Sequence, residues 1–93
     1  MENLQGLDNL RLLKLSHNKI ERIECLNECV KLEELYLEKN YISQIENLAH
    51  LTRLKKLELG SNQITRLNGL SMLTGLQWLS LEDNKIKSLE SKP

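Results

Sequence analysis

Apolar residues recur along this chain with a spacing of 22 residues. Four asparagines mark this period, and leucine occupies the positions eight, five and three residues before each of them. Isoleucine follows each asparagine after two residues, again in all four units. The asparagines are Asn18, Asn40, Asn62 and Asn84. A fixed period in this range predicts a solenoid, in which each unit buries its apolar side against its neighbours.

Each unit has two parts with different apolar spacing. Before the asparagine, the alternation Leu35-Tyr36-Leu37 has a period of two, which predicts a short strand with its leucines on one face. After the asparagine the spacing becomes three, as from Ile42 to Ile45, which predicts extended turns or short 3₁₀ segments and no long helix. Stacked units would pair the strands in parallel, about 4.8 Å apart, around one leucine core.

The asparagines are expected to belong to the scaffold. A carboxamide has donors and an acceptor that can bond the open backbone groups where a strand ends and the chain turns inward. An asparagine among apolar neighbours has to be satisfied in this way. Asn18, Asn40, Asn62 and Asn84 are therefore predicted to be structural.

The shared unit is L-x-x-L-x-L-x-x-N-x-I-x-x-I/L-x-x-L-x-x-L. It resembles the leucine-rich repeat over essentially the whole chain, and specifically the 22-residue class typified by the nuclear regulatory subunit of protein phosphatase 1. The resemblance implies an α/β solenoid that is mostly β, with short parallel strands on a concave face and turns or 3₁₀ segments on a convex face.

The length of 93 residues allows one small domain. Within residues 1–93 we expect a partial repeat at 1–9 and repeats at about 10–31, 32–53, 54–75 and 76–93. Neither end has a recognisable cap, and an uncapped solenoid exposes leucines and a strand edge. We therefore expect a fragment of a longer array, with end-to-end self-association through the termini as an alternative.

Composition narrows the classes of partner. Thirteen basic and thirteen acidic residues give a net charge of zero, which argues against nucleic acid and anionic membranes. No apolar run approaches the roughly 20 residues that span a bilayer. Two cysteines make no disulfide framework, and no glycosylation triplet occurs. We expect an intracellular, cytoplasmic location. The resemblance adds nuclear or ciliary and cytoskeletal sites as alternatives.

The positions between the strand leucines are not fixed by the repeat and are expected to line the concave face. They form three rows, which are Leu12, Glu34, Lys56 and Trp78; Lys14, Tyr36, Glu58 and Ser80; and Ser16, Glu38, Gly60 and Glu82. Four glutamates against two lysines give this face a charge of −2. The predicted partner-binding residues are Leu12, Lys14, Glu34, Tyr36, Glu38, Lys56, Glu58, Trp78 and Glu82.

Tyr36 and Trp78 are two of only three aromatic residues, and both fall on this face. Protein interfaces enrich tyrosine and tryptophan as anchors, which favours a contact role. The alternative is that each ring simply lies over neighbouring strand side chains. Leu12 has a similar alternative, since it would also cover the first coil.

The chain has no recognisable catalytic or metal-binding motif. Cys25 and Cys29 lack the further ligands of a zinc site, and His17 and His50 fall on different coils and are expected to face solvent. Cys29 takes a leucine position and is expected to be a buried thiol. Since no phosphate loop, metalloprotease helix or serine elbow is present, we expect no enzyme activity, cofactor or metal.

The leading hypothesis is a protein–protein interaction module that acts as an adaptor or regulatory scaffold for a protein partner. Proteins that resemble this class are mostly intracellular adaptors, including phosphatase regulators, an axonemal dynein light chain, centrosomal and ciliary scaffolds, a spliceosomal subunit and tubulin-folding cofactors. The alternative is a purely structural segment of a longer solenoid, for example in a ciliary, centrosomal or axonemal protein. Nucleic-acid binding would require a basic stripe, and the neutral charge argues against it.

Overall fold

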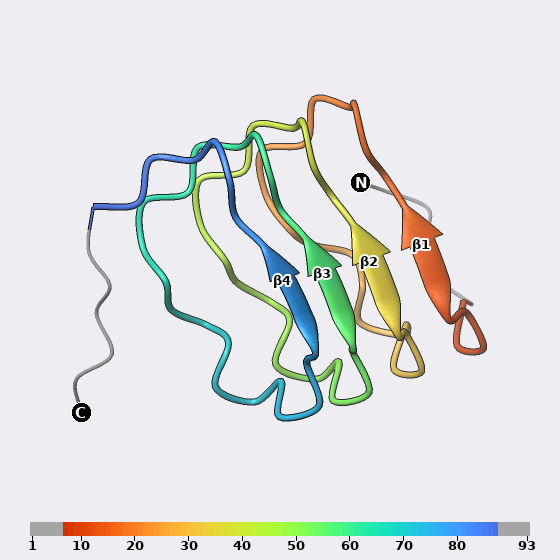
Figure 1. The fold of residues 1–93 in the computed structure, drawn as a ribbon. Coiled ribbons are helices and arrows are strands. Elements are labelled where there is room, and N and C mark those ends of the chain that lie inside the picture. The colour runs from red at the N-terminus through yellow and green to blue at the C-terminus, as the bar shows by residue number, and fades with distance from the viewer. Residues whose placement is uncertain (1–6, 88–93) are drawn as a thin grey trace.

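Four short strands lie side by side in one parallel sheet, in the order β1-β2-β3-β4 (Figure 1). They are β1 (Leu12–Lys14), β2 (Glu34–Tyr36), β3 (Lys56–Glu58) and β4 (Trp78–Ser80). The computed structural model describes residues 7–87, so the predicted repeat segments at 1–6 and 88–93 lie outside the described residues. Paired residues of neighbouring strands are 22 positions apart, as Leu35 and Leu57 are. The expected mostly-β solenoid with short parallel strands is confirmed.

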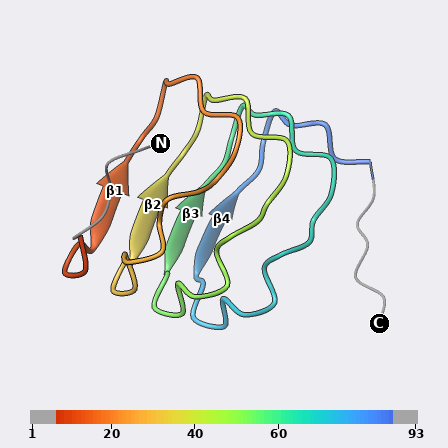
Figure 2. The ribbon, with the colours of Figure 1, turned by 180° about the vertical axis from the view of Figure 1, so that it is seen from behind.

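Between strands the chain returns along the opposite side of the solenoid, and the return segments stack on one another as the strands do (Figures 1 and 2). The leucines between the two layers form the core, because alternate strand residues point inward. The buried apolar residues are Ile23, Leu26, Cys29, Leu32, Leu35, Leu37, Ile42, Ile45, Leu48, Leu51, Leu54, Leu57, Leu59, Ile64 and Leu73. Cys29 is buried among them in its leucine position, as expected.

The return segments contain turns and bends, as the first of the two predicted alternatives, and no residue of 7–87 lies in a 3₁₀ helix. Leu51 N–H donates to the Leu48 carbonyl at 2.9 Å, and Leu54 N–H donates to the Leu51 carbonyl at 3.1 Å. The same pair of bonds recurs in the neighbouring coils. Only every third N–H closes such a turn, so the turns do not join into a continuous 3₁₀ helix. None of the described residues belongs to a helix that is long and apolar enough to cross a membrane.

Each strand is followed by a residue in the left-handed region of backbone conformation, directly before the asparagine. These residues are His17, Lys39, Ser61 and Asp83, with φ values of 59°, 62°, 54° and 57°. For a residue with a side chain, this conformation is about 1–2 kcal/mol less favourable than the right-handed one. The conformation therefore depends on the hydrogen bonds of the asparagine beside it.

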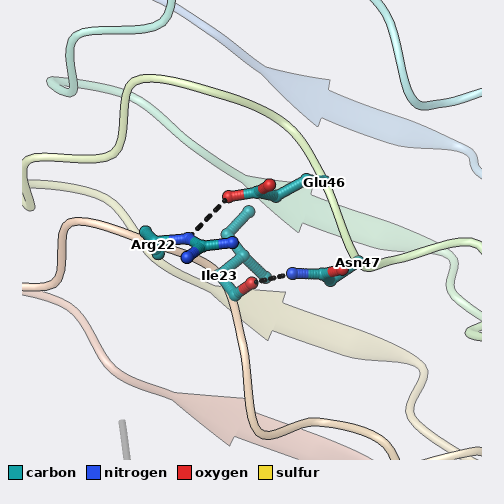
Figure 3. Close-up of polar contacts among 4 residues, drawn as sticks. All are labelled: Arg22, Ile23, Glu46 and Asn47. Atoms are coloured by element: carbon teal, nitrogen blue, oxygen red, sulfur yellow. Dashed lines mark hydrogen bonds and ion pairs between the residues drawn. The ribbon is translucent and has the colours of Figure 1, made fainter.

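A second left-handed row lies in the return segments at Cys25, Asn47 and Gly69, with φ values of 65°, 60° and 77°. The Asn47 amide Nδ2 donates to the Ile23 carbonyl of the preceding coil at 2.7 Å (Figure 3). At Gly69 a Cβ atom would lie only 2.6 Å from the Ile45 carbonyl oxygen. The backbone of the third coil therefore approaches the second coil where glycine has no side chain.

Candidate functional site

The outer surface of the sheet carries the residues predicted to bind a partner; we call it the sheet face. The register aligns Leu12, Glu34, Lys56 and Trp78 across the strands, and it aligns Lys14, Tyr36, Glu58 and Ser80 in a second line. Six of the nine predicted residues share direct side-chain contacts. Within residues 7–87, Leu12, Glu38 and Glu82 lie on the same face but take no part in those contacts.

Ammonium groups and aromatic rings alternate across all four strands. Lys14 Nζ lies 5.2 Å from the centroid of the Tyr36 ring. Lys56 Nζ lies 5.2 Å from the same ring and 5.3 Å from the Trp78 ring. A cation within about 6 Å of a ring centroid is attracted by the ring quadrupole. We call Lys14, Tyr36, Lys56 and Trp78 the cation–aromatic row.

Two glutamates fix the rings of this row. The Tyr36 hydroxyl donates to Glu34 Oε1 at 2.8 Å, and Trp78 Nε1 donates to Glu58 Oε2 at 3.3 Å. Each ring therefore has its polar atom bonded within the face, which limits the orientations that it can adopt. These contacts match the alternative expectation, in which each ring lies over the side chains of neighbouring strands.

The surroundings of Lys56 favour its charged form. Interaction with the Tyr36 side chain is the main cause that raises the pKa of Lys56, and the carboxylates of Glu34 and Glu58 raise the pKa further. Desolvation acts in the opposite direction and is smaller than the effect of Tyr36. The ammonium form that these surroundings favour is the form that attracts both aromatic rings.

Exposed apolar side chains occur on the sheet face and elsewhere. Trp78 is 53% exposed, and Leu12 is also exposed. Trp78 lies on β4 and Leu12 on β1, and two strands separate them. Tyr41 is 51% exposed and lies outside the three predicted rows. Tyr41 is the third aromatic residue of the sequence, and its aromatic character is the feature that could have marked it. The prediction missed it because its position falls outside the three rows. Val30 and Met72 are further exposed apolar residues off this face.

The asparagine row holds adjacent coils together behind the sheet face. Asn40 Nδ2 donates to the carbonyl of Leu37 in its own coil at 2.9 Å and to the carbonyl of Leu15 in the preceding coil at 3.1 Å. Asn40 Oδ1 accepts the backbone N–H groups of Asn18 and Ile20, both at 3.1 Å. Asn62 and Asn84 also bond both their own coil and the preceding coil.

The opposite side of the solenoid has its own contacts between coils. Arg22 Nε lies 3.4 Å from Glu46 Oε2, close to the bond from Asn47 to Ile23 (Figure 3). The Arg22 side chain is largely exposed, so this pair contributes little to stability. The expectation that His50 faces solvent is wrong, because its ring is half-buried and Nε2 bonds the carbonyl of the preceding coil at 2.8 Å. His17 is exposed, as expected.

The two cysteines are free and lie in different surroundings. Cys25 is exposed and Cys29 is buried. Burial raises the pKa of the Cys29 thiol, and the nearby Glu28 carboxylate raises it further. A buried thiol with a raised pKa is unreactive. Among residues 7–87, no group of three or more histidine, cysteine, aspartate and glutamate side chains is placed to hold a metal ion.

Comparisons with known proteins agree with the geometry. The family described as "Leucine Rich repeats (2 copies)" matches residues 8–50 and 52–93. The chain is similar to an internalin, InlF from Listeria monocytogenes, with 30% identity and a TM-score of 0.81 over 89% of this chain and 24% of that chain. It therefore spans about a quarter of that structure's length.

A second similar structure is the functional domain of InlJ from Listeria monocytogenes. The identity is 17% and the TM-score is 0.42, over 95% of this chain and 29% of that chain. No curated protein sequence matches the chain significantly. Leucine-rich repeat domains generally mediate protein–protein interaction, and the fold is typically a non-enzymatic interaction module.

Proposed function

Because the chain belongs to the leucine-rich repeat family, we propose that it is a non-enzymatic interaction module that binds a protein partner on its sheet face. The site consists of the cation–aromatic row with Glu34 and Glu58, extended by Leu12, Glu38 and Glu82. Its role is that of an adaptor or regulatory scaffold. Neither nucleic acid nor a membrane surface is the proposed partner, since the chain has no net charge to attract either.

The observation that carries this proposal is the cation–aromatic row. The core does not require aromatic residues at positions 36 and 78, and yet both rings lie there with their polar atoms bonded to neighbouring glutamates. A face whose side chains are already ordered loses less entropy when a partner binds. Trp78 remains more than half exposed, which leaves a large apolar surface for a partner to cover.

We also propose that the chain belongs to the 22-residue class typified by the nuclear regulatory subunit of protein phosphatase 1. The constant 22-residue register of the four strands supports this assignment. An intracellular, cytoplasmic location is proposed with it, with nuclear or ciliary and cytoskeletal sites as alternatives. Fluorescence imaging of the tagged protein in its own cells tests the location, and secretion into the medium would contradict it.

The first experiment compares partner capture by the parent chain and by the double variant Tyr36→Ala/Trp78→Ala. The matched control is Tyr41→Ala, because Tyr41 is about as exposed as Trp78 but lies off the sheet face. Circular dichroism first establishes that all three chains fold equally. We expect the parent and the control to capture the same protein and the double variant to lose it. Equal capture by all three chains would place the binding surface elsewhere.

A second candidate function is a structural segment of a longer solenoid. The observation that favours it is Leu79, which is 37% exposed at the centre of β4, whereas its counterparts in β2 and β3 are fully buried. Completing the fourth 22-residue unit after residue 93 and adding one further unit in the same register would cover Leu79 and raise the urea midpoint. Self-association through the ends is the other way to cover it, and sedimentation equilibrium would show a mass that increases with concentration.

A further inference from the structure

The return segment of the third coil contains an asparagine that is directly followed by glycine. Of the nine asparagines in the sequence, only Asn68 precedes a glycine, Gly69. The side-chain amide of an asparagine can be attacked by the backbone nitrogen of the next residue, and a side chain on that next residue hinders the attack. Glycine has no Cβ atom and a freer backbone, so it removes this hindrance. Asn68 is therefore the asparagine at which the sequence hinders this reaction least.

The structure leaves both reacting groups accessible. Asn68 and Gly69 are exposed on the return side of the solenoid. Within residues 7–87, the Asn68 side chain has no hydrogen-bond partner, and the Gly69 N–H donates to no acceptor. Neither group therefore has to break a hydrogen bond before it reacts, and water reaches both.

Asn47 shows the opposite arrangement one coil earlier. Its amide Nδ2 donates to the Ile23 carbonyl at 2.7 Å, so the carboxamide is held against the preceding coil (Figure 3). The next residue is Leu48, which is buried and carries a branched side chain. Asn40 and Asn62 are buried and are held by several hydrogen bonds each. These asparagines should resist the reaction to which Asn68 is open.

We propose that Asn68 is a site of spontaneous deamidation, with water as the only other reactant. The Gly69 backbone nitrogen attacks Asn68 Cγ, a C–N bond forms there, and the Cγ–Nδ2 bond breaks. Nδ2 leaves as ammonia and carries away the proton that the Gly69 nitrogen loses, so that a five-membered succinimide ring remains. Water then adds to one of the two ring carbonyl carbons and opens the ring. The product is aspartate, or isoaspartate with the backbone running through Cγ of residue 68.

The isoaspartate product changes the backbone beside a tight contact. Gly69 has a φ of 77°, and a Cβ atom there would lie 2.6 Å from the Ile45 carbonyl oxygen, so the third return segment lies close to the second. Isoaspartate inserts one methylene group into the backbone directly before Gly69. We expect this product to disturb the contact and to lower the urea midpoint. The aspartate product keeps the original backbone and should leave the midpoint nearly unchanged.

Either product also adds a negative charge on the side of the solenoid opposite the sheet face. The parent chain has a net charge of zero at pH 7, so one new carboxylate gives the product a charge of −1. Asn68 lines a surface hollow together with Arg66, whose guanidinium is a cation near the new carboxylate. Native isoelectric focusing should therefore resolve the modified chain as a more acidic species.

Incubation of the intact folded chain at mildly alkaline pH, followed by peptide mapping, tests the proposal. The tryptic peptide 67–85 contains Asn68 and Asn84, and electron-transfer fragmentation separates these two sites and distinguishes aspartate from isoaspartate. Isoaspartate is also measured by methyl transfer from labelled S-adenosylmethionine with an isoaspartyl methyltransferase. We expect Asn68 to be modified several-fold faster than any other asparagine. The rate should rise with pH, because the attacking nitrogen has to lose its proton.

Two variants with the same chemical change separate this site from the other exposed asparagines. Asn68→Gln keeps an amide but would have to form a six-membered ring, so it should remove most of the methyl transfer and most of the acidic species. The matched control is Asn27→Gln, because Asn27 is also exposed but precedes Glu28, and it should leave both readouts unchanged. Urea denaturation establishes that both variants fold as the parent does.

The readouts are mass, charge and methyl transfer, so the proposal is independent of partner binding on the sheet face. An unmodified Asn68 in the folded chain would overturn the proposal. Modification that occurs only in urea would overturn it as well, because the fold would then protect the pair. Equal rates at Asn68 and Asn27 would show that the following glycine does not determine the site, and the assignment would fail.

Discussion

The two inner coils and the two outer coils share the constant leucine, asparagine and isoleucine positions of the repeat, but the surroundings of these residues differ. Leu35 and Leu57, at the centres of β2 and β3, are 0% exposed, whereas Leu79 in β4 is 37% exposed. Asn40 and Asn62 are 5% and 6% exposed, and Asn18 of the first coil is exposed. The repeat position determines which way a side chain points, and the neighbouring coils determine how completely it is buried.

This difference follows from the one-dimensional architecture. Each coil contacts only the coils beside it, so an inner coil has two neighbours and an outer coil has one within the described chain. An identical substitution at the same repeat position should therefore change stability by unequal amounts. The following substitutions test that expectation, beginning with the largest effect.

Leu57→Ala should lower the free energy of unfolding by about 3–5 kcal/mol, because it removes a fully buried side chain between two coils. Leu79→Ala should cost about 1–2 kcal/mol, since solvent already reaches this side chain. Urea denaturation followed by circular dichroism measures both values. Complete loss of the cooperative transition in Leu57→Ala would agree with the expectation. Equal losses for the two variants would show that neighbouring coils do not set the contribution of a leucine.

Asn40→Ala should cost about 1–3 kcal/mol, because backbone groups of two coils lose their partners. Asn18→Ala should cost less than about 1 kcal/mol, because within residues 7–87 the exposed Asn18 amide bonds only its own coil, at the carbonyls of Leu15 and Ser16. Urea denaturation again gives the difference. Equal losses of stability in Asn40→Ala and Asn18→Ala would mean that the hydrogen bonds within a coil, rather than those between coils, stabilise the turn.

The sequence was sufficient to predict the rows that the repeat holds constant. The period places Leu13, Leu35, Leu57 and Leu79 in one register across the strands. The same arithmetic places the residues of the sheet face in rows, because alternate strand residues must point away from the core.

The sequence could not predict contacts that depend on side-chain rotamers or on the path of the return segments. Lys56 sits against both Tyr36 and Trp78, although the sequence shows only that the three share a face. His50 bonds a backbone carbonyl of the coil before it, and no residue type marks such a carbonyl in advance. The left-handed conformations before the asparagines could not be predicted either, because glycine, the usual sequence sign of this conformation, is at none of the four positions.

Gly69→Ala tests a contact between the inner coils against a glycine in an open position. It should cost about 1–2 kcal/mol, because φ is +77° and a Cβ atom would lie 2.6 Å from the Ile45 carbonyl oxygen. Gly75→Ala should instead stabilise by about 0.4–1 kcal/mol, since its φ is not in the left-handed region and a Cβ would meet nothing closer than 3.9 Å. Thermal unfolding should separate the two variants. An unchanged thermal stability of Gly69→Ala would mean that the two return segments can move apart without destabilising the protein.

Trp78→Ala should have the smallest effect on stability and a large effect on partner binding. The side chain is 53% exposed and lies on an outer strand, so its loss should lower the free energy of unfolding by less than about 1 kcal/mol, close to the value of one exposed cation–aromatic contact. Tyr41→Ala, at similar exposure but off the sheet face, should be equally mild and should leave binding unchanged. Urea denaturation and a binding titration on the same two proteins make the comparison. A loss of stability as large as that of Leu57→Ala would place Trp78 with the core residues, and the argument that the scaffold leaves this position free for a partner would fail.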